Sequence, residues 1–313
     1  MTMERRALGA SGLTITPLVL GGNVFGWTTD KATSFAILDA FVDRGGTMID
    51  TADVYSAWVS GHKGGESETV IGEWLQRSGK RDAVLIATKV GMMPGGLNPD
   101  AIERAVEGSL SRLGTDRIDL YFAHKDDAET PLDATLEAFS RLIDAGKVRS
   151  IGASNYSAMR LKAALDTAKA AHLPHYAVLQ PEYNLVSRRD FEGELQNLAV
   201  THNIGVIPYY GLASGFLTGK YRSVDDLGKS VRGGGMAKLL EGKGGEMLAA
   251  MDAVSAETGA TLAQIALAWL AAQDGVTAPI ASATSVDQVD ELMGYLDVAL
   301  TREQIDRLTA AGA

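Results

Sequence analysis

Short apolar runs alternate with amphipathic segments along almost the whole length of this chain. The apolar runs span residues 18–21, 47–50, 84–88, 118–123, 148–154, 177–181, 205–209 and 276–280. Each run has the length of one buried strand, and each is followed by a segment long enough to form a helix. Parallel strands need such helical connections, so the alternation predicts repeated β-α units around a parallel sheet.

The helical segments have recognisable beginnings. Residues 31–44 carry apolar side chains at helical spacing. Asn98 followed by Pro99 is typical of a helix start, because asparagine caps the first free amides and proline fits the first helical position. Thr301 with Gln304 has the spacing of a capping box. These signals predict helices between the strands, arranged as an outer layer.

Eight strand–helix units in 313 residues, without a linker, favour one closed (β/α)8 TIM barrel as a single domain over residues 1–313. A doubly wound sheet is the alternative. It should carry G-x-G-x-x-G after its first strand, and residues 21–26 do not have that spacing. We also expect an N-terminal β-hairpin from residues 5–8 and 13–15, and a long irregular loop after strand seven, at 218–245.

The composition excludes several classes of protein. Hydrophobic residues make up 46% and charged residues 22%, which is typical of a globular protein. The net charge of −10 argues against nucleic-acid binding. Cysteine is absent, so no disulfide framework or thiolate nucleophile is available. No run has the length of a membrane span, and no apolar leader segment opens the chain. We therefore expect a cytoplasmic protein without membrane or nucleic-acid partners; the sequence does not indicate an oligomeric state.

Two opposite charges are expected at neighbouring strand ends. Asp50 is the last residue of the apolar run at 47–50, where an unpaired carboxylate would be costly to bury. Lys89 follows the next run and supplies the cation. A structural ion pair would explain these two residues alone.

Tyr55 and His124 extend this pair toward catalysis. A lysine beside Tyr55 would favour its phenolate and so lower its pKa, and His124 follows the adjacent strand. A loop aromatic and a half-buried imidazole are the structural alternatives. Together the four residues provide what carbonyl reduction requires when a cofactor brings the hydride.

At this point the sequence resembles the aldo-keto reductase family over essentially its whole length. The motifs that carry the resemblance are residues 50–55, 87–91, 119–124, 146–155 and 180–184. The segment 213–221, Ala-Ser-Gly-Phe-Leu-Thr-Gly-Lys-Tyr, is similar to the branch that holds bacterial enzymes and potassium-channel β-subunits. The resemblance implies a TIM barrel that uses NADPH, with NADH not excluded, to reduce an aldehyde or ketone to the alcohol.

Carried over residue by residue, the resemblance implies a role for each member of the tetrad. Tyr55 would be the general acid and Lys89 would lower its pKa. Asp50 would pair with Lys89, and His124 would orient the carbonyl. No metal is implied.

The resemblance also implies where the cofactor binds. Gly22 and Asn23 would lie near the nicotinamide half. The remaining contacts, from the nicotinamide to the adenosine end, would be made by Ser154, Asn155, Gln180, Tyr209, Leu212, Ser214, Gly215, Lys220, Ser282, Thr284, Gln288 and Glu291. Helix capping is the alternative role of Ser154 and Gln288.

Two departures from the family pattern affect these expectations. Tyr209 is followed by Tyr210 and Gly211 where serine and proline are common, so the pyrophosphate loop is expected to differ in shape. Ser285 stands where the family often has a cation for a 2′-phosphate, which weakens the expectation of NADPH over NADH.

A hydrophobic or ring-bearing small-molecule carbonyl is the expected substrate, held by a wall of Phe25, Trp27 and Trp58. Packing between loops is the alternative role of each of these residues. Two other functions stay open. A nucleotide-sensing regulatory subunit would keep the tetrad and turn over little. A metal-dependent hydrolase would be built on His124 with Asp126 and Asp127.

Overall fold

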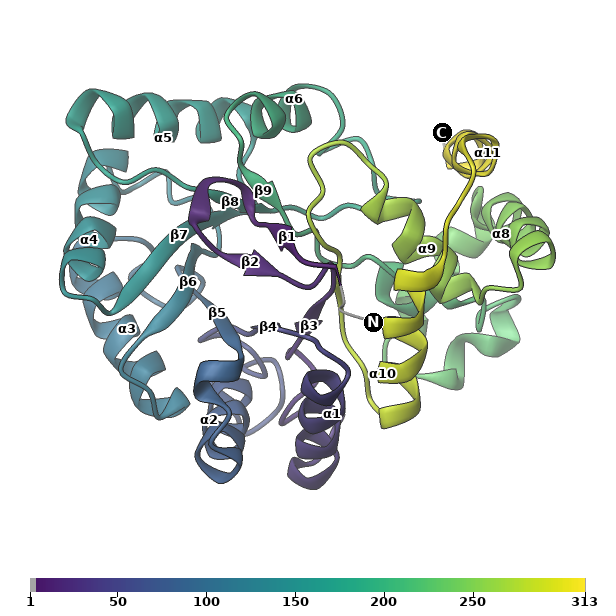
Figure 1. Ribbon diagram of the computed structural model, residues 1–313, viewed down its shortest axis with the longest axis horizontal. Coiled ribbons are helices and arrows are strands. Elements are labelled where there is room, and N and C mark those ends of the chain that lie inside the picture. Colours follow the sequence, from purple (N-terminus) through teal and green to yellow (C-terminus); the bar gives the residue numbers. More distant parts are fainter. Residues whose placement is uncertain (1–3, 313) are drawn as a thin grey trace.

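The computed structural model describes residues 4–312 and contains one curled sheet of eight parallel strands (Figure 1). The strand order is β10-β3-β4-β5-β6-β7-β8-β9. The strands are β3 Val19–Gly21, β4 Met48–Asp50, β5 Leu85–Val90, β6 Ile118–Ala123, β7 Val148–Ser154, β8 Val178–Gln180, β9 Gly205–Val206 and β10 Ile280–Ala281. Val206 of β9 bridges Val276, just ahead of β10, and so brings the two ends of the sheet together. The sequence prediction of a (β/α)8 barrel is confirmed.

Helices surround the sheet as an outer layer (Figure 1). They are α1 Lys31–Asp43, α2 Glu66–Ser78, α3 Pro99–Leu113, α4 Leu132–Asp144, α5 Ala158–Ala171, α6 Glu194–Thr201, α7 Ala237–Glu241, α8 Gly244–Thr258, α9 Leu262–Ala271, α10 Val286–Met293 and α11 Arg302–Ala311. The expected caps form: Asn98 accepts a hydrogen bond from the Ala101 amide at the start of α3, and Thr301 with Gln304 makes a capping box on α11.

The core has two layers because side chains of a strand alternate between its faces. Leu120 and Phe122 of β6 point into the barrel, where they pack with Val178 and Ile207. Tyr121, between them, belongs to the larger apolar layer that separates the strands from the helices. The barrel interior is therefore packed with side chains, and the space for a ligand lies at its end.

The predicted hairpin forms from β1 Arg6–Ala7 and β2 Thr14–Ile15, which pair antiparallel. It lies across one end of the barrel (Figure 1), where Leu8 and Ile15 pack into the barrel interior. Gly9 has φ +53°, and a side chain there would collide with the backbone of Gly205. Because these contacts involve the start of β9, the hairpin closes the amino-terminal end of the barrel and leaves the carboxyl end for function.

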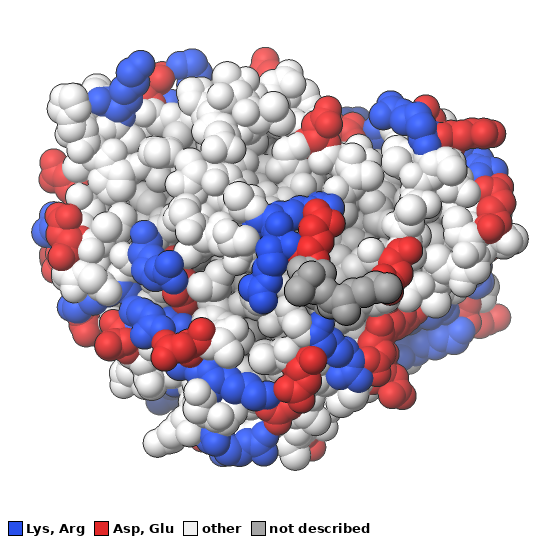
Figure 2. All heavy atoms as spheres, in the orientation of Figure 1, with Lys and Arg blue, Asp and Glu red and all other residues white. Residues whose placement is uncertain are grey.

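On the face that Figure 2 shows, Lys and Arg are interspersed with Asp and Glu. Mixed charges of this kind give no extended basic surface on that side of the molecule. Between residues 4 and 312, no helix combines the length and the apolar character needed to cross a membrane.

The long segment after strand seven is less irregular than expected. The region 218–245 contains two short 3-10 helices, η4 Val224–Lys229 and η5 Gly233–Met236, followed by α7. Ser223 caps η4 together with Asp226, a local signal that sequence periodicity does not register in so short a helix. The long excursion after strand seven lies where the sequence predicted it, and its short helices make it more regular than expected.

Candidate active site

The polar residues expected at strand ends meet at the carboxyl end of the barrel. Asp50 ends β4, Lys89 lies in β5 and His124 follows β6. The other three positions are Ser154 at the end of β7, Gln180 at the end of β8 and Tyr209, which follows β9 and bridges Glu182. Parallel strands bring their carboxyl ends to the same rim, so one topology positions all six side chains.

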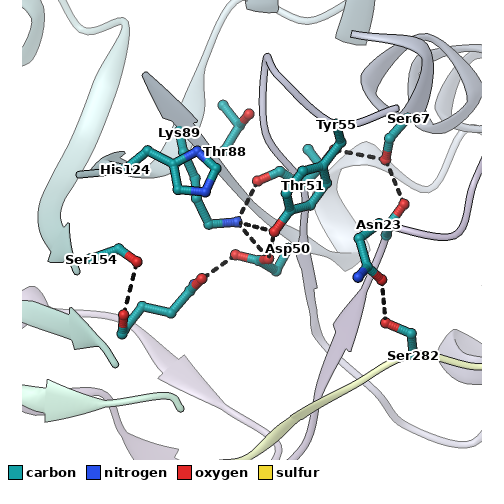
Figure 3. Close-up of polar contacts among 12 residues, drawn as sticks. Asn23, Asp50, Thr51, Tyr55, Ser67, Thr88, Lys89, His124, Ser154 and Ser282 are labelled. Atoms are coloured by element: carbon teal, nitrogen blue, oxygen red, sulfur yellow. Dashed lines mark hydrogen bonds and ion pairs between the residues drawn. The ribbon is translucent and has the colours of Figure 1, made fainter. Parts of the chain in front are cut away.

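Lys89 is the centre of the site (Figure 3). Its Nζ donates to Asp50 Oδ2 at 2.6 Å, to the Thr51 carbonyl at 2.7 Å and to Tyr55 Oη at 2.9 Å. Lys89 is fully buried and Asp50 is 2% exposed. Three acceptors match the three protons of an ammonium group, so the cation is fully satisfied without water.

Tyr55 lies at the edge of this ion pair. Its hydroxyl donates to Asp50 Oδ2 at 3.3 Å while accepting from Lys89. Burial, followed by the charge of Asp50 and the hydrogen bond to it, raises the pKa of Tyr55 well above its ordinary value of 10. This direction is opposite to the expectation that Lys89 lowers the pKa. The sequence indicated a cation near Tyr55. It did not indicate how completely the phenol is buried from solvent or that Asp50 also contacts it.

His124 faces Tyr55, with ring centroids 6.0 Å apart and the ring planes at 72°. Burial and, to a smaller degree, Lys89 hold the pKa of His124 well below 6.5. The imidazole is therefore neutral at physiological pH and has one N–H to donate. No described residue contacts its buried Nδ1 by a hydrogen bond.

A chain of hydrogen bonds joins the other strand ends to the tetrad. Gln180 Nε2 donates to Asp50 Oδ1 at 2.8 Å, and Ser154 Oγ donates to the Gln180 carbonyl at 2.8 Å. Asn155 Nδ2 contacts Ser154 and the His124 carbonyl, and its Oδ1 accepts from Tyr209 Oη at 2.7 Å. The network holds amide and hydroxyl groups at one wall of the site.

A cavity of about 1000 Å³ extends from the tetrad toward β10 and α10. The sequence-predicted residues that line it are Asn23, Asp50, Tyr55, Trp58, His124, Ser154, Asn155, Gln180, Tyr209, Leu212, Ser214, Gly215, Lys220, Ser282, Thr284, Gln288 and Glu291. The volume lies at the upper end of the range for small-molecule sites and suits an extended ligand such as a dinucleotide.

Four sequence-predicted residues do not line the cavity. Lys89 lies beneath its floor, and Gly22 is buried, with its amide donating to the Asp50 carbonyl at 2.7 Å. Phe25 is fully buried in the layer beneath the helices. Trp27 packs edge-to-face on Trp58 at 5.5 Å and so supports the wall from behind. The expectation that Phe25 and Trp27 form the wall directly is therefore corrected; an aromatic residue near a strand end can face either side of its loop.

The residues predicted to hold the pyrophosphate form a cradle. Gly215 has φ +95°, and a Cβ added there would lie 2.9 Å from Lys220 Nζ. Ser214 also has a positive φ, of 56°. The two positive φ values form one tight loop beside the Lys220 ammonium, an arrangement that fits a phosphate group.

The residues predicted to hold the adenosine end combine capping with exposure to the cavity. Ser282 Oγ donates to Asn23 Oδ1 at 2.7 Å, which ties β10 to the loop after β3 (Figure 3). The side-chain Oε1 of Gln288 accepts from the backbone N–H of Thr284 at 2.8 Å. The backbone N–H of Gln288 donates to Ser285 Oγ at the start of α10. Gln288 thus caps its helix and also lines the cavity, so the two alternatives are compatible.

Several lining residues were not predicted as site residues. Lys125 follows His124, and Ser230, Val231 and Arg232 come from the segment between η4 and η5. The Arg232 guanidinium lies over the Trp27 ring at 5.1 Å. A basic residue in a long excursion was a signal for this contact, but only tertiary structure shows which one reaches the cavity.

Other basic residues of the excursion are engaged elsewhere. Arg222 makes two hydrogen bonds to Asp252, and Lys229 pairs with Asp226 at 2.7 Å. Neither of them lines the cavity. Among the basic residues of this excursion, Lys220 and Arg232 line the cavity, so these two could meet an anionic ligand there.

The residues proposed for a metal site have other partners. Asp126 accepts two hydrogen bonds from Arg160, both at 2.8 Å. Asp127 accepts from the Leu97 amide and from Thr130. Within residues 4–312 no three His, Asp or Glu side chains are grouped as metal ligands would be. The structure gives the hydrolase alternative no ligand set in that range.

Comparisons with known proteins agree with this geometry. The profile of the Aldo/keto reductase family matches residues 17–313. A probable voltage-gated potassium channel subunit beta of Oryza sativa subsp. japonica is 34% identical, over 98% of this chain and 96% of its own length. The uncharacterized oxidoreductase YrpG of Bacillus subtilis is 35% identical, over 96% and 93%. The aldo-keto reductase yakc [NADP(+)] of Schizosaccharomyces pombe is 32% identical, over 93% and 87%. The barrel, the strand-end tetrad and these matches together place the chain in the aldo/keto reductase family.

Proposed function

We propose that this protein reduces a small-molecule aldehyde or ketone to the alcohol, reversibly, with NADPH as the preferred nicotinamide cofactor and a cytoplasmic location. The observation that carries the proposal is the position of Tyr55, whose hydroxyl lies 2.9 Å from the Lys89 ammonium at the wall of a dinucleotide-sized cavity. A phenol in this position can donate a proton to a carbonyl oxygen while its negative charge is stabilised from behind.

Tyr55 is the general acid in this proposal. Its raised pKa keeps the phenol protonated in the resting site, so the proton is available at physiological pH. When the proton leaves, the ammonium of Lys89 stabilises the phenolate, because the hydrogen bond between them becomes charge-assisted. Asp50 neutralises Lys89 before the reaction and fixes its position.

His124 orients the carbonyl. A neutral imidazole can donate one hydrogen bond to the substrate oxygen without competing as an acid with Tyr55. The two rings meet edge-to-face with their centroids 6.0 Å apart, which leaves both polar groups close enough to share one substrate oxygen atom. A reduced nicotinamide, when bound, supplies the hydride.

The remaining lining residues would hold the cofactor. Ser154, Asn155 and Gln180 offer amide and hydroxyl groups for the carboxamide, and the ring of Tyr209 offers a stacking surface. Gly215 and Lys220 would hold the pyrophosphate, because the tight turn at Gly215 lies beside the Lys220 ammonium. The similarity to a relative named for NADP(+) supports NADPH over NADH. Thermal-shift titrations should show a lower dissociation constant for NADPH than for NADH; the reverse order would refute this preference.

The test of the proposed acid is Tyr55→Phe. We expect the rate of reduction to fall by about 10²-fold to 10⁴-fold, while affinity for NADPH stays within about twofold, because the ring is kept and the proton is lost. A panel of aldehydes and ketones followed at the nicotinamide absorbance measures the rate. Tyr156→Phe, which removes a buried hydroxyl that contacts Tyr176, is the matched control. Unchanged turnover in Tyr55→Phe would rule out the assigned acid.

A nucleotide-sensing regulatory subunit is the second candidate, favoured by the similarity to a probable potassium channel subunit beta. Such a protein would bind the cofactor, oxidise it once with an aldehyde and then turn over very slowly. Comparing the single-turnover rate with the steady-state rate distinguishes the two functions. A steady-state rate more than about 10³-fold below the single-turnover rate would favour the sensor.

A further inference from the structure

A second group of polar side chains lies behind the tetrad, between the barrel and helices α2 and α3. Its members, which we call the rear cluster, are Asp53, Glu68, Thr88, Arg112 and Tyr121. Asp53 is 6% exposed, and Glu68, Thr88 and Tyr121 are fully buried. None of the five lines the cavity, so the cluster is separate from the residues that meet a ligand.

Glu68 has a complete set of partners within the rear cluster. It accepts hydrogen bonds from Thr88 Oγ1 at 2.5 Å and from Arg112 Nε at 2.7 Å. Thr88 can reach it because neighbouring side chains of β5 alternate: Lys89 points into the site and Thr88 away from it (Figure 3). Glu68 and Arg112 therefore neutralise each other.

Asp53 adds a negative charge that this pair does not balance. No described residue donates a hydrogen bond to its buried Oδ1, and the buried hydroxyl of Tyr121 also has no partner among the described residues. The charged and titratable groups around Asp53 are Glu68 on α2, Arg112 on α3 and Lys89 on β5. Tyr121 on β6 lies within the electrostatic influence of the same carboxylate.

Asp53 is coupled to the tetrad through the loop that joins Asp50 to Tyr55. Its amide donates to the Lys89 carbonyl at 3.3 Å, and the Lys89 ammonium donates to the carbonyl of Thr51 in the same loop. Burial and Glu68 raise the pKa of Asp53 to about 7, against the smaller opposing effects of Arg112 and Lys89. This pKa places the change of charge near neutral pH, in the loop whose Thr51 carbonyl accepts from the Lys89 ammonium.

We propose that Asp53 is a positioning residue whose protonation state sets how strongly Lys89 stabilises the phenolate of Tyr55. The inference rests on the proposed function of Tyr55 as the acid. Asp53 does not touch the substrate: it exchanges its proton with solvent and acts through the charge of Lys89.

The sign of the effect follows from the charges. Ionised Asp53 is a second negative group near Lys89, in addition to Asp50, and it weakens the positive field at Tyr55. When Asp53 is protonated, only Asp50 of these two carboxyl groups opposes the positive field of Lys89. Reduction is therefore faster on the acidic side, and its rate falls as the pH rises through about 7.

The test compares Asp53→Asn with Asp82→Asn, the same substitution at an exposed aspartate ahead of β5. Single-turnover oxidation of bound NADPH by an aldehyde is measured from pH 5.5 to 9. In the wild type and in Asp82→Asn we expect a fall of about threefold to tenfold around pH 7. In Asp53→Asn, the rate measured at acidic pH should persist as the pH rises through 7. If the pH–rate profile of Asp53→Asn keeps its inflection near pH 7, the inference is overturned.

A second measurement does not depend on turnover. In protein labelled with ¹³C-aspartate, one carboxyl resonance should titrate near pH 7, and Asp53→Asn should lack it. Arg112→Gln should move that titration to higher pH, because a neighbouring cation is lost. Absence of any aspartate titration between pH 6 and 8 overturns the inference. A protein that shows this titration but reduces no carbonyl would instead refute the proposed function alone.

Discussion

Replacing Lys89 with methionine tests the buried ion pair in stability and in catalysis together. Methionine keeps the length of the side chain and removes the charge, which leaves Asp50 buried with Gln180 and Tyr55 as its remaining donors. Loss of one partner of a buried ion pair costs about 3–5 kcal/mol. Because two donors remain, we expect the lower end, about 3 kcal/mol, or a fall in Tm of about 4–5 °C for a chain of 313 residues.

The double variant Lys89→Met/Asp50→Asn separates the two roles of the pair. Both charges are then absent, so no carboxylate is left uncompensated, and we expect most of the lost stability to return. Activity should not return, because no cation remains to stabilise the phenolate of Tyr55. Stability recovered without activity is therefore the expected pattern.

Urea unfolding and single-turnover oxidation of bound NADPH measure the two quantities. Lys162→Met removes the cation of an exposed pair with Asp166 and should leave both nearly unchanged. A single variant as stable as the wild type would show that the pair makes no net contribution. Wild-type turnover in the double variant would show that catalysis does not need Lys89.

Three further predictions concern pH, the cofactor and the substrate. The depressed pKa of His124 means that below pH 6.5 the unfolded chain binds a proton that the folded chain does not. On acidification, the free energy of unfolding of the wild type should therefore fall by about 1 kcal/mol per pH unit more steeply than that of His124→Leu, measured in urea between pH 5 and 6.5; equal slopes would contradict the neutral imidazole. Gly215→Val should weaken NADPH binding by about tenfold or more in calorimetry, because φ is +95° and the cradle is filled, whereas Gly228→Ala, where a Cβ meets open space, should bind normally. Trp58→Ala should raise KM for ring-bearing aldehydes by about tenfold and leave that for acetaldehyde unchanged, and an equal effect on both would remove Trp58 from the substrate wall.

The sequence predicted the barrel well because its signals are local. A buried strand needs only a short apolar run, and a helix start needs only a capping residue such as Asn98. The strand-end rule then brought Asp50, Lys89 and His124 to one rim, since parallel strands share their direction. The catalytic roles of these residues stay predictions.

What the sequence did not predict depends on depth and on distant contacts. Phe25 follows a strand just as Trp58 does, but one is fully buried and the other is 51% exposed. The direction of the Tyr55 pKa shift depends on desolvation, which no motif encodes. The rear cluster brings Asp53 near Glu68 on α2 and Arg112 on α3. Local sequence patterns do not predict contacts between residues so far apart in the chain.

The junction between the two ends of the sheet has few hydrogen bonds. Thr277 donates to the Val206 carbonyl at 2.8 Å and Ile280 donates to the Pro208 carbonyl at 3.0 Å. Tyr209 and Ser282, which line the cavity from opposite sides of this junction, would be bridged by one long ligand. The bound cofactor would then hold the two ends of the sheet together. Slower hydrogen exchange of the backbone amides at this junction would show that the cofactor is bound, without any measurement of turnover.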